Sequence, residues 1–103
     1  MAVKVIIERS VSPDNQGEMA EFLKELRAKA ILQTGYISGE TLFSVNRPGV
    51  HVVISTWESL RDWKAWEKNP ARKAIMRKID ELLRAKSKVS VFATTPRSIA
   101  EGV

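Results

Sequence analysis

Residues 55–75 read S-T-W-E-S-L-R-D-W-K-A-W-E-K-N-P-A-R-K-A-I and contain all three tryptophans of the chain. Trp57 ends an apolar run rich in β-branched residues, which is typical of a strand. Trp63 and Trp66 lie three residues apart, a spacing that places two side chains on one face of a helix. The stretch therefore predicts a strand that leads into an aromatic-rich helix. Its indole rings belong either to a deep core or to the wall of an apolar pocket.

Capping residues divide the helical part of this stretch in two. Ser59, with Asp62 three residues later, is similar to a capping box and favours a helix start. Asn69 and Pro70 end that helix and begin another, because Asn caps helix N-termini and Pro suits the first turn. We expect the second helix over residues 71–85. Its buried positions follow helical spacing: Ile75, Ile79, Leu82 and Leu83.

The remaining apolar patterns predict further strands and one more helix. Strands are expected over residues 3–11, 36–45, 50–57 and 89–92. After loop residues 12–17, a helix is expected to run to about Gln33, where Gly35 suits the left-handed cap. Gly39 is expected to mark a bulge. Residues 46–49 form a turn that makes an antiparallel hairpin of its flanking strands. The first helix has this apolar face: Met19, Phe22, Leu23, Leu26 and Ala30.

The predicted order is β-α-β-β-α-α-β, the ferredoxin-like, split βαβ topology of an α+β protein with a four-stranded antiparallel sheet. Its helices cover one face of the sheet. The strand at residues 50–57 is apolar on both faces, so the opposite face also needs a packing partner. We therefore expect a homodimer joined sheet to sheet. The domain is expected over residues 1–95, followed by a C-terminal tail over residues 96–103.

Composition limits the classes of function. The chain of 103 residues has no cysteine, which excludes disulfides, thiolate chemistry and cysteine metal sites. It has no run of about 18 apolar residues, so no membrane span is expected. The N-terminus enters a strand pattern directly and does not resemble a signal peptide, so we expect a cytoplasmic protein.

The net charge of +5 is unevenly distributed. Residues 58–103 hold 11 Lys and Arg against 6 Asp and Glu. A solvated helix face is the simplest interpretation of this excess, and attraction of an anionic ligand or nucleic acid is the alternative. The basic residues concerned are Arg72, Lys73, Arg77, Lys78 and Arg84.

The pattern V-V-I-S-T-W-E-S-L-R-D-W-K-A-W-E-K-N-P at residues 52–70 lies between a predicted hairpin and an amphipathic helix. It resembles the antibiotic biosynthesis monooxygenase (ABM) domain, a branch of the dimeric α+β barrel superfamily. The similarity spans roughly residues 3–93. It implies a homodimer with a pocket between sheet and helices. Some members of the family oxidise polycyclic aromatic substrates with O₂ and no cofactor, others open the haem ring, and many have no known activity.

The haem-degrading branch of this family is not expected here. That branch uses a tryptophan on the second helical segment, a histidine ten residues later and an asparagine on the first strand. Trp66 matches the tryptophan, but Met76 stands ten residues later, and no asparagine lies near Ile7. Methionine does not replace the proximal imidazole of this branch. His51 is the only histidine and cannot build a metal cluster alone, so no metal is expected. The resemblance to the cofactor-free members of the family implies that no cofactor is needed.

A cofactor-free oxygenase must exclude water, hold an aromatic ring and favour its anion. The resemblance makes Trp66, Trp63, Phe22, Phe43 and Met76 candidates for substrate contact. His51 is the candidate catalytic residue, and Tyr36 and Arg9 are the other polar groups of the sheet that suit the chemistry. Each also has a structural interpretation. The tryptophans, Trp57 above all, and Met76 suit a core, His51 suits a packed strand, and Arg9 suits a strand end or an interface.

Three functions follow from these patterns. The first is a cofactor-independent monooxygenase acting on a small aromatic or quinol-like substrate. The second is a non-catalytic dimer of the same fold that binds a small apolar ligand or has a regulatory role. The third is RNA binding, because RNA-recognition domains share the β-α-β-β-α-β order. The strand V-H-V-V-I-S-T-W lacks the stacking aromatics and basic pattern of those domains, so no nucleic acid is expected.

Overall fold

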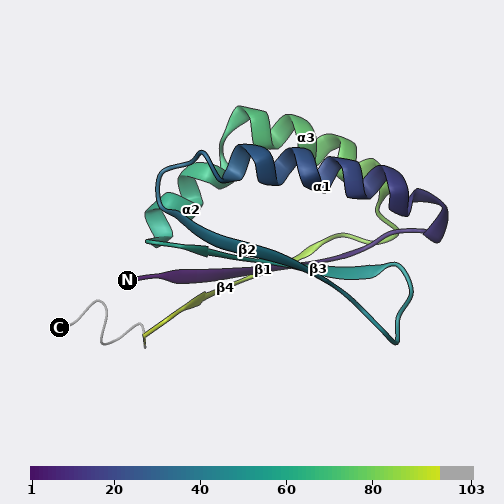
Figure 1. Ribbon diagram of the computed structural model, residues 1–103, viewed down its shortest axis with the longest axis horizontal. Coiled ribbons are helices and arrows are strands. Elements are labelled where there is room, and N and C mark those ends of the chain that lie inside the picture. Colours follow the sequence, from purple (N-terminus) through teal and green to yellow (C-terminus); the bar gives the residue numbers. More distant parts are fainter. Residues whose placement is uncertain (96–103) are drawn as a thin grey trace.

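Four antiparallel strands form one sheet, and the helices lie on one of its faces (Figure 1). The computed structural model describes residues 1–95. Across the sheet the strand order is β2-β3-β1-β4, which confirms the predicted ferredoxin-like topology. The expected tail at residues 96–103 lies outside the described residues. The strands are β1 (Val3–Ser10), β2 (Tyr36–Phe43), β3 (Val50–Trp57) and β4 (Lys88–Ala93).

Within residues 1–95, three α-helices and one short 3₁₀ turn accompany the sheet. The turn is η1 (Pro13–Asn15), and the helices are α1 (Gln16–Ala30), α2 (Leu60–Glu67) and α3 (Pro70–Leu82). Among residues 1–95, no helix is long and apolar enough to cross a membrane.

Local capping signals start two of the helices where the sequence predicts. The Ser59 hydroxyl oxygen accepts a hydrogen bond from the Asp62 backbone N–H at 3.1 Å. The Asn69 side-chain oxygen accepts from the backbone N–H groups of Ala71 at 2.8 Å and Arg72 at 3.3 Å. These side chains satisfy donors that the first turn of a helix leaves free. The sequence therefore predicts the break between α2 and α3 from local capping residues.

Two helices end earlier than predicted. The helix expected over residues 71–85 is α3, which ends at Leu82. It stops there because Leu83 pairs with Val11 and the Arg84 N–H donates to the Ser10 carbonyl at 2.9 Å. The first ends at Ala30 rather than near residue 33, and Gly35 then turns the chain with φ +83°. The end of α3 thus comes from contacts with the end of β1, whereas α1 gives way to local turns in which the Gln33 N–H donates to the Ala30 carbonyl at 3.0 Å.

The core lies between the sheet and the helices. One cluster of buried side chains gathers the three tryptophans against β1, and a second joins α1 and α3. The first contains Val3, Val5, Ile7, Ala30, Trp57, Trp63 and Trp66, and the second contains Val11, Met19, Ile75 and Ile79.

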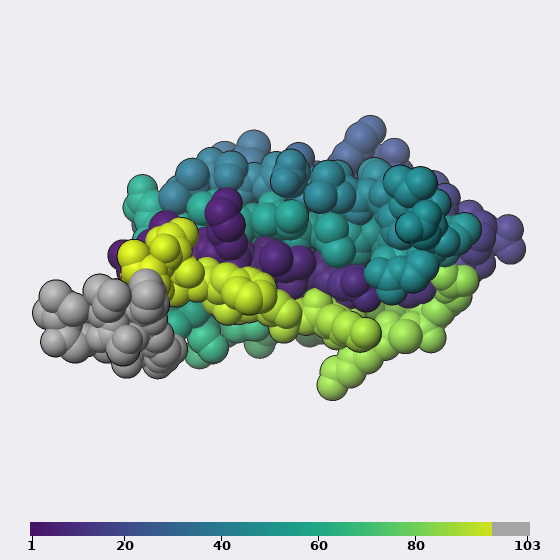
Figure 2. All heavy atoms as spheres, turned by 90° about the horizontal axis from the view of Figure 1, so that it is seen from below, coloured from purple at the N-terminus to yellow at the C-terminus, as the bar shows by residue number. Residues whose placement is uncertain are grey.

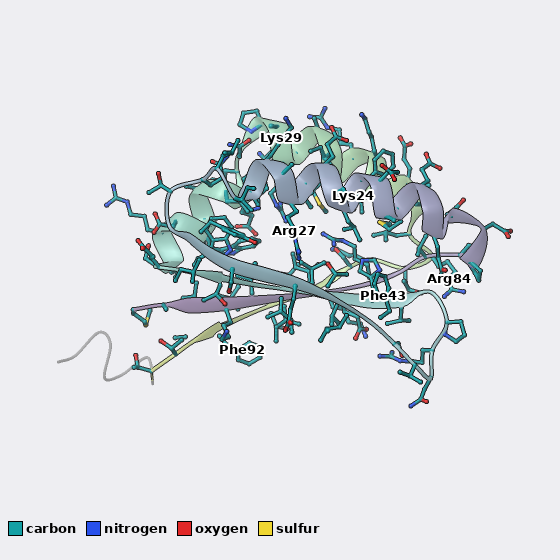
Figure 3. The ribbon with its side chains drawn as sticks, viewed as in Figure 1. Lys24, Arg27, Lys29, Phe43, Arg84 and Phe92 are labelled. Atoms are coloured by element: carbon teal, nitrogen blue, oxygen red, sulfur yellow. The ribbon has the colours of Figure 1, made fainter. Side chains whose placement is uncertain are left out.

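The opposite face of the sheet lies open in the single chain and carries an apolar patch beside charged residues such as Lys4 and Glu40. Ile6 of β1 pairs directly with Ile54 of β3 on this face, and Leu42 and Phe92 are exposed beside them. Phe92 points away from the helices (Figure 3). Figure 2 views the molecule from this side, where the yellow atoms of β4 lie beside the purple atoms of β1.

Candidate functional site

A cavity of about 60 Å³ lies between α1, α2 and the sheet, with all three indole rings in its wall. We call it the tryptophan pocket. Trp66 is 4% exposed, and Trp63 and Trp57 are more deeply buried. Trp57 lies in the core as expected, yet it also borders the cavity. The three indoles therefore belong both to the core and to the wall of the pocket.

The aromatic wall is held by ring contacts that cross between β2, β3 and α2. The Trp57 ring stacks on Trp66 with centroids 6.4 Å apart and is tilted against Trp63 at 6.2 Å. Tyr36 meets Trp57 edge-on at 5.4 Å. The Trp57 indole N–H donates to the Ser55 hydroxyl at 3.1 Å. Such contacts add to burial and fix ring orientation, so the wall is a pre-formed apolar surface.

Gly39 of β2 makes room for polar groups at the edge of the tryptophan pocket. A Cβ atom at Gly39 would lie 2.6 Å from the Tyr36 hydroxyl and 3.6 Å from Nη2 of Arg27. Arg27 extends from α1 toward the sheet (Figure 3). A phenol and a guanidinium thus share the edge of the pocket. The irregularity of the sheet falls between Tyr36 and Ser38, next to the residue where a bulge was expected.

Two arginines are buried beside this pocket. Arg72, in the first turn of α3, is 9% exposed and lines the pocket, with its guanidinium carbon 5.3 Å from the centre of the Trp63 ring. Its Nη1 donates to the Glu67 carbonyl at 3.4 Å. Arg9 is 1% exposed, and its Nη2 donates to Sδ of Met76 at 3.5 Å. Within residues 1–95, Nε and Nη1 of Arg9 have no hydrogen-bond partner.

Burial destabilises both charges. It lowers the pKa of Arg9 to about 10, with a further contribution from the positive charge of Arg72, while Asp80 acts in the opposite direction. Burial also lowers the pKa of Arg72, against the attraction of Glu67 and Asp80. In the described part of the chain, neither arginine has a carboxylate within 4.0 Å.

The burial of both arginines was not predicted. Arg9 was expected at a strand end or an interface; it lies one residue before the end of β1, but its side chain points inward under the helices and is buried. Arg72 was expected on a solvated helix face, but it shares the inward face of α3 with Ile75 and Ile79. The other basic residues of that group are exposed.

A second cavity, of about 230 Å³, lies toward the β2–β3 turn and has His51 in its wall. We call it the histidine pocket. His51 is 3% exposed, and its Nε2 has no hydrogen-bond partner among the described residues. Burial and then the nearby charge of Arg9 lower the pKa of His51, so its imidazole is neutral at pH 7. Leu23 of α1 borders both pockets.

The structure distributes the candidate residues over three places. Trp63 and Trp66 line the tryptophan pocket, whereas His51 and Phe43 line the histidine pocket. The Phe43 ring is tilted toward His51 at 6.2 Å but is 71% exposed, because it lies at the end of edge strand β2. Phe22 and Met76 instead pack against the second core cluster, where Lys78 lies over the Phe22 ring at 5.9 Å.

Sequence reasoning missed Arg27, and it named Arg72 only among the basic residues that an anionic ligand could contact, without placing it in the tryptophan pocket. A signal for both was present. Arg72 precedes Ile75 and Ile79 by three and seven residues, and Arg27 follows Leu23 by four. These spacings place each arginine on the apolar, inward face of its helix.

The side chains around Trp66 do not fit a haem group. Met76 lies ten residues after Trp66, where the haem-degrading branch has its histidine, and it accepts a hydrogen bond from Arg9. His51 borders the other pocket. In the described ranges, no three His, Asp or Glu side chains gather as metal ligands would.

The topology and the aromatic cavity together define a ferredoxin-like α+β protein with an internal apolar pocket. The family model described as antibiotic biosynthesis monooxygenase matches residues 2–78. The chain belongs to this family, as the pattern at residues 52–70 predicted. No curated protein matches the sequence at a significant level.

Several solved structures share the fold. A conserved protein from Methanosarcina mazei Go1 superposes with a TM-score of 0.87 at 16% identity, covering 92% of this chain and 94% of that one. Rv0793 from Mycobacterium tuberculosis gives 0.84 at 19% identity, covering 95% and 99%. SnoaB, a cofactor-independent oxygenase from Streptomyces nogalater, gives 0.80 at 15% identity, covering 92% and 94%. At these identities the similarity concerns the fold alone.

Proposed function

We propose that this protein is a cofactor-independent monooxygenase that oxidises a small aromatic or quinol-like substrate with O₂. The observation that carries the proposal is the buried wall of three indoles around a cavity in a chain of the ABM family. The shared fold with SnoaB, described as a cofactor-independent oxygenase, supports it.

The chemistry requires no external reductant. A phenol or hydroquinone with a free ortho or para ring position and O₂ give a quinone and water, so the substrate supplies all the electrons. The task of the protein is then to bind the ring, exclude water and stabilise the ionised substrate. The stacked faces of Trp57 and Trp66 suit the first two tasks.

Substrate size points to a role for the neighbouring pocket. An apolar cavity of about 150 Å³ holds a benzene ring, and the tryptophan pocket is smaller, at about 60 Å³. We propose that a substrate displaces Leu23 and extends into the histidine pocket. Phe43 then contacts its far end, and the neutral His51 accepts a proton through Nε2 from a hydroxyl group at that end. Leu23 is suited to this movement because its side chain is only half-buried.

We also propose a homodimer joined through the outer face of the sheet. The paired Ile6 and Ile54 with the exposed Leu42 and Phe92 form an apolar surface there. Such a surface in a small domain is typical of a protein–protein interface. A second copy of the same sheet offers a matching surface.

One observation favours the non-catalytic alternative. The only histidine has a lowered pKa, and a weaker base is a poorer proton acceptor. In this alternative the tryptophan pocket binds an aromatic ligand without turnover.

Oxygen uptake with a panel of hydroquinone-like and anthrone-like substrates tests the proposal. We expect uptake by the wild type and a loss of about tenfold or more in Trp66→Ala, equivalent to about 1.4 kcal/mol of transition-state stabilisation. Lys64→Ala, at an exposed position of the same helix, is the control and should retain activity. Ligand binding without oxygen uptake would instead favour the non-catalytic alternative.

A further inference from the structure

We infer that the ligand of the tryptophan pocket is an aromatic oxyanion, with its ring against the indoles and its negatively charged oxygens on the guanidinium group of Arg72. The inference rests on the proposed function for the location of the site, and it adds the charge of the ligand. It is argued from three features: the lining of the pocket, the contacts of Arg72 and the contacts of Arg9.

The pocket lining has positive groups without negative ones. Arg27 and Arg72 both line the tryptophan pocket, and the described part of the chain contributes no aspartate or glutamate to it. The rest of the wall is mainly apolar and aromatic. A ligand that fills this space therefore meets rings on one side and guanidinium groups on the other.

Arg72 is fixed in place, and although the charges of Glu67 and Asp80 attract it, no carboxylate of the described residues forms an ion pair with it. The Trp63 ring lies 5.3 Å from its guanidinium carbon, and the Glu67 backbone carbonyl accepts one of its hydrogen bonds. Neither contact provides a full negative charge. The only ion pairs within residues 1–95 join Lys24 to Glu21 and Arg47 to Glu8, away from this residue. A guanidinium held by a ring and one carbonyl still has donors in the fork geometry that suits a carboxylate or a phenolate.

Arg9 provides a second, independent observation. It is almost completely buried, and two of its donor atoms have no partner in the described residues. The acidic group that acts on it is Asp80, whose side chain is on the exposed side of α3, and the positively charged Arg72 and the neutral His51 are its other titratable neighbours. A buried charge without a partner is costly, and proteins retain such groups mainly at functional sites. An anion on Arg72 reduces this cost by placing negative charge near both arginines.

An aryl carboxylate and an ionised phenol share this chemistry, and small probes distinguish them. Benzoate and benzamide have nearly the same shape and differ in charge. 4-Nitrophenol, measured below and above the pH at which its hydroxyl ionises, tests the phenolate. The three indole N–H signals in a ¹H–¹⁵N NMR spectrum of the full chain report on binding, because all three tryptophans line the pocket.

We expect the indole signals to respond to benzoate with at least tenfold higher affinity than to benzamide, or to 4-nitrophenol only when it is ionised. The first result indicates a carboxylate ligand and the second a phenolate. Arg72→Gln should abolish the preference, whereas Arg77→Gln, at an exposed position of the same helix, should retain it. If Arg72→Gln does not fold, Arg72→Lys provides the same test, because it keeps the charge but loses the planar fork and should weaken the preference several-fold.

Equal affinity for charged and neutral probes would overturn the inference, as would an anion preference unchanged by Arg72 substitutions. Its failure is distinguishable from that of the proposed function. If the protein consumes oxygen with a neutral quinol but shows no preference for anions, the proposed function is supported and the inference is wrong. If Arg72→Gln removes an anion preference but no substrate supports oxygen uptake, the inferred ligand class is supported and the monooxygenase proposal is wrong.

Discussion

Arg9 and His51 are direct partners in the pairing of β1 with β3, so a guanidinium and an imidazole lie side by side on the inward face of the sheet. Both side chains are buried. Protonation of His51 would place a second positive charge next to the first in a medium of low dielectric constant. The pairing therefore favours the neutral imidazole, which is the form that accepts a proton.

The Arg9–His51 pairing predicts a loss of stability in mild acid. In the unfolded chain His51 has its ordinary pKa of 6.5, and the folded value is lower. Between the two values the unfolded chain binds more protons, so the free energy of unfolding rises with pH there. The contribution is fully present above pH 6.5 and is lost as the pH falls toward the folded pKa.

Urea unfolding just below pH 6.5 measures this effect. We expect His51→Gln to reduce the slope of stability against pH, because the substituted side chain does not titrate. The wild type and the variant share all other ionisable groups, so the difference between their slopes isolates His51. Equal slopes in the two proteins would contradict the lowered pKa.

Arg9→Met is expected to stabilise the ligand-free protein. The substitution keeps an unbranched side chain and removes a buried charge whose Nε and Nη1 have no partner among residues 1–95. Replacement of buried charged groups by apolar ones of similar volume often stabilises proteins by about 1–4 kcal/mol. Chemical denaturation measures the change. Arg77→Met, at an exposed position, is the control and should change stability by less than about 0.5 kcal/mol. A clear destabilisation by Arg9→Met would show that its charge is compensated.

The parts of the fold that the sequence predicts are those with local causes. The helix starts at Ser59 and Asn69 depend on side chains that bond to their own first turn, so the pattern of a few residues is sufficient. The order of strands follows from alternation and from short turns. The sheet-and-helix arrangement then follows from the general rules of connection.

The candidate site was less predictable because its geometry depends on which strand the helices cover. Phe43 and Arg9 both lie on the inward face of the sheet, as alternation requires. Phe43 is nevertheless exposed at the end of an edge strand, and Arg9 is buried in a central one. From the sequence, Phe43 was expected to contact substrate and Arg9 to lie at a strand end or an interface. Position in the sheet decides how exposed each of these side chains is.

Gly39→Ala is expected to disturb the edge of the tryptophan pocket. The new Cβ would lie 2.6 Å from the Tyr36 hydroxyl, so the phenol must move and its edge contact with Trp57 weakens. We expect a loss of about 1 kcal/mol, within the range of aromatic pair energies, and weaker binding of aromatic ligands. Gly17→Ala is a matched control, because no atom lies within 4 Å of its new Cβ in helix α1. It should stabilise the protein by about 0.5–1 kcal/mol. Thermal denaturation of both variants measures the contrast, and a stabilising Gly39→Ala would show that Tyr36 adapts without cost.

Ile54→Lys is expected to convert a dimer into a monomer. The substitution places a charge opposite Ile6, within the apolar patch of the outer face. Sedimentation of the wild type should give about twice the chain mass of 11.6 kDa, and the variant should give the single mass. Ala74→Lys, at an exposed position of α3, controls for the added charge and should leave the assembly unchanged. A monomeric wild type at micromolar concentration would end the sheet-to-sheet proposal.

Leu23→Ala is expected to join the two pockets. Leu23 borders both cavities, whereas Leu26, on the same helix and also half-buried, borders the tryptophan pocket alone. Both substitutions to alanine enlarge the tryptophan pocket, and each should cost about 1–3 kcal/mol, near the lower end of the range for buried leucines. The two variants differ in one respect: only Leu23→Ala should let a ligand that is bound against the indoles also reach His51.

The imidazole C–H signals of His51 report that difference, because it is the only histidine in the chain. With 1-naphthol as the ligand, we expect these signals to shift more strongly in Leu23→Ala than in the wild type. Leu26→Ala should show indole shifts without a matching increase at His51. If the His51 signals respond equally in both variants, Leu23 is not the barrier between the pockets. His51 would then need another route to a substrate held by Trp63 and Trp66.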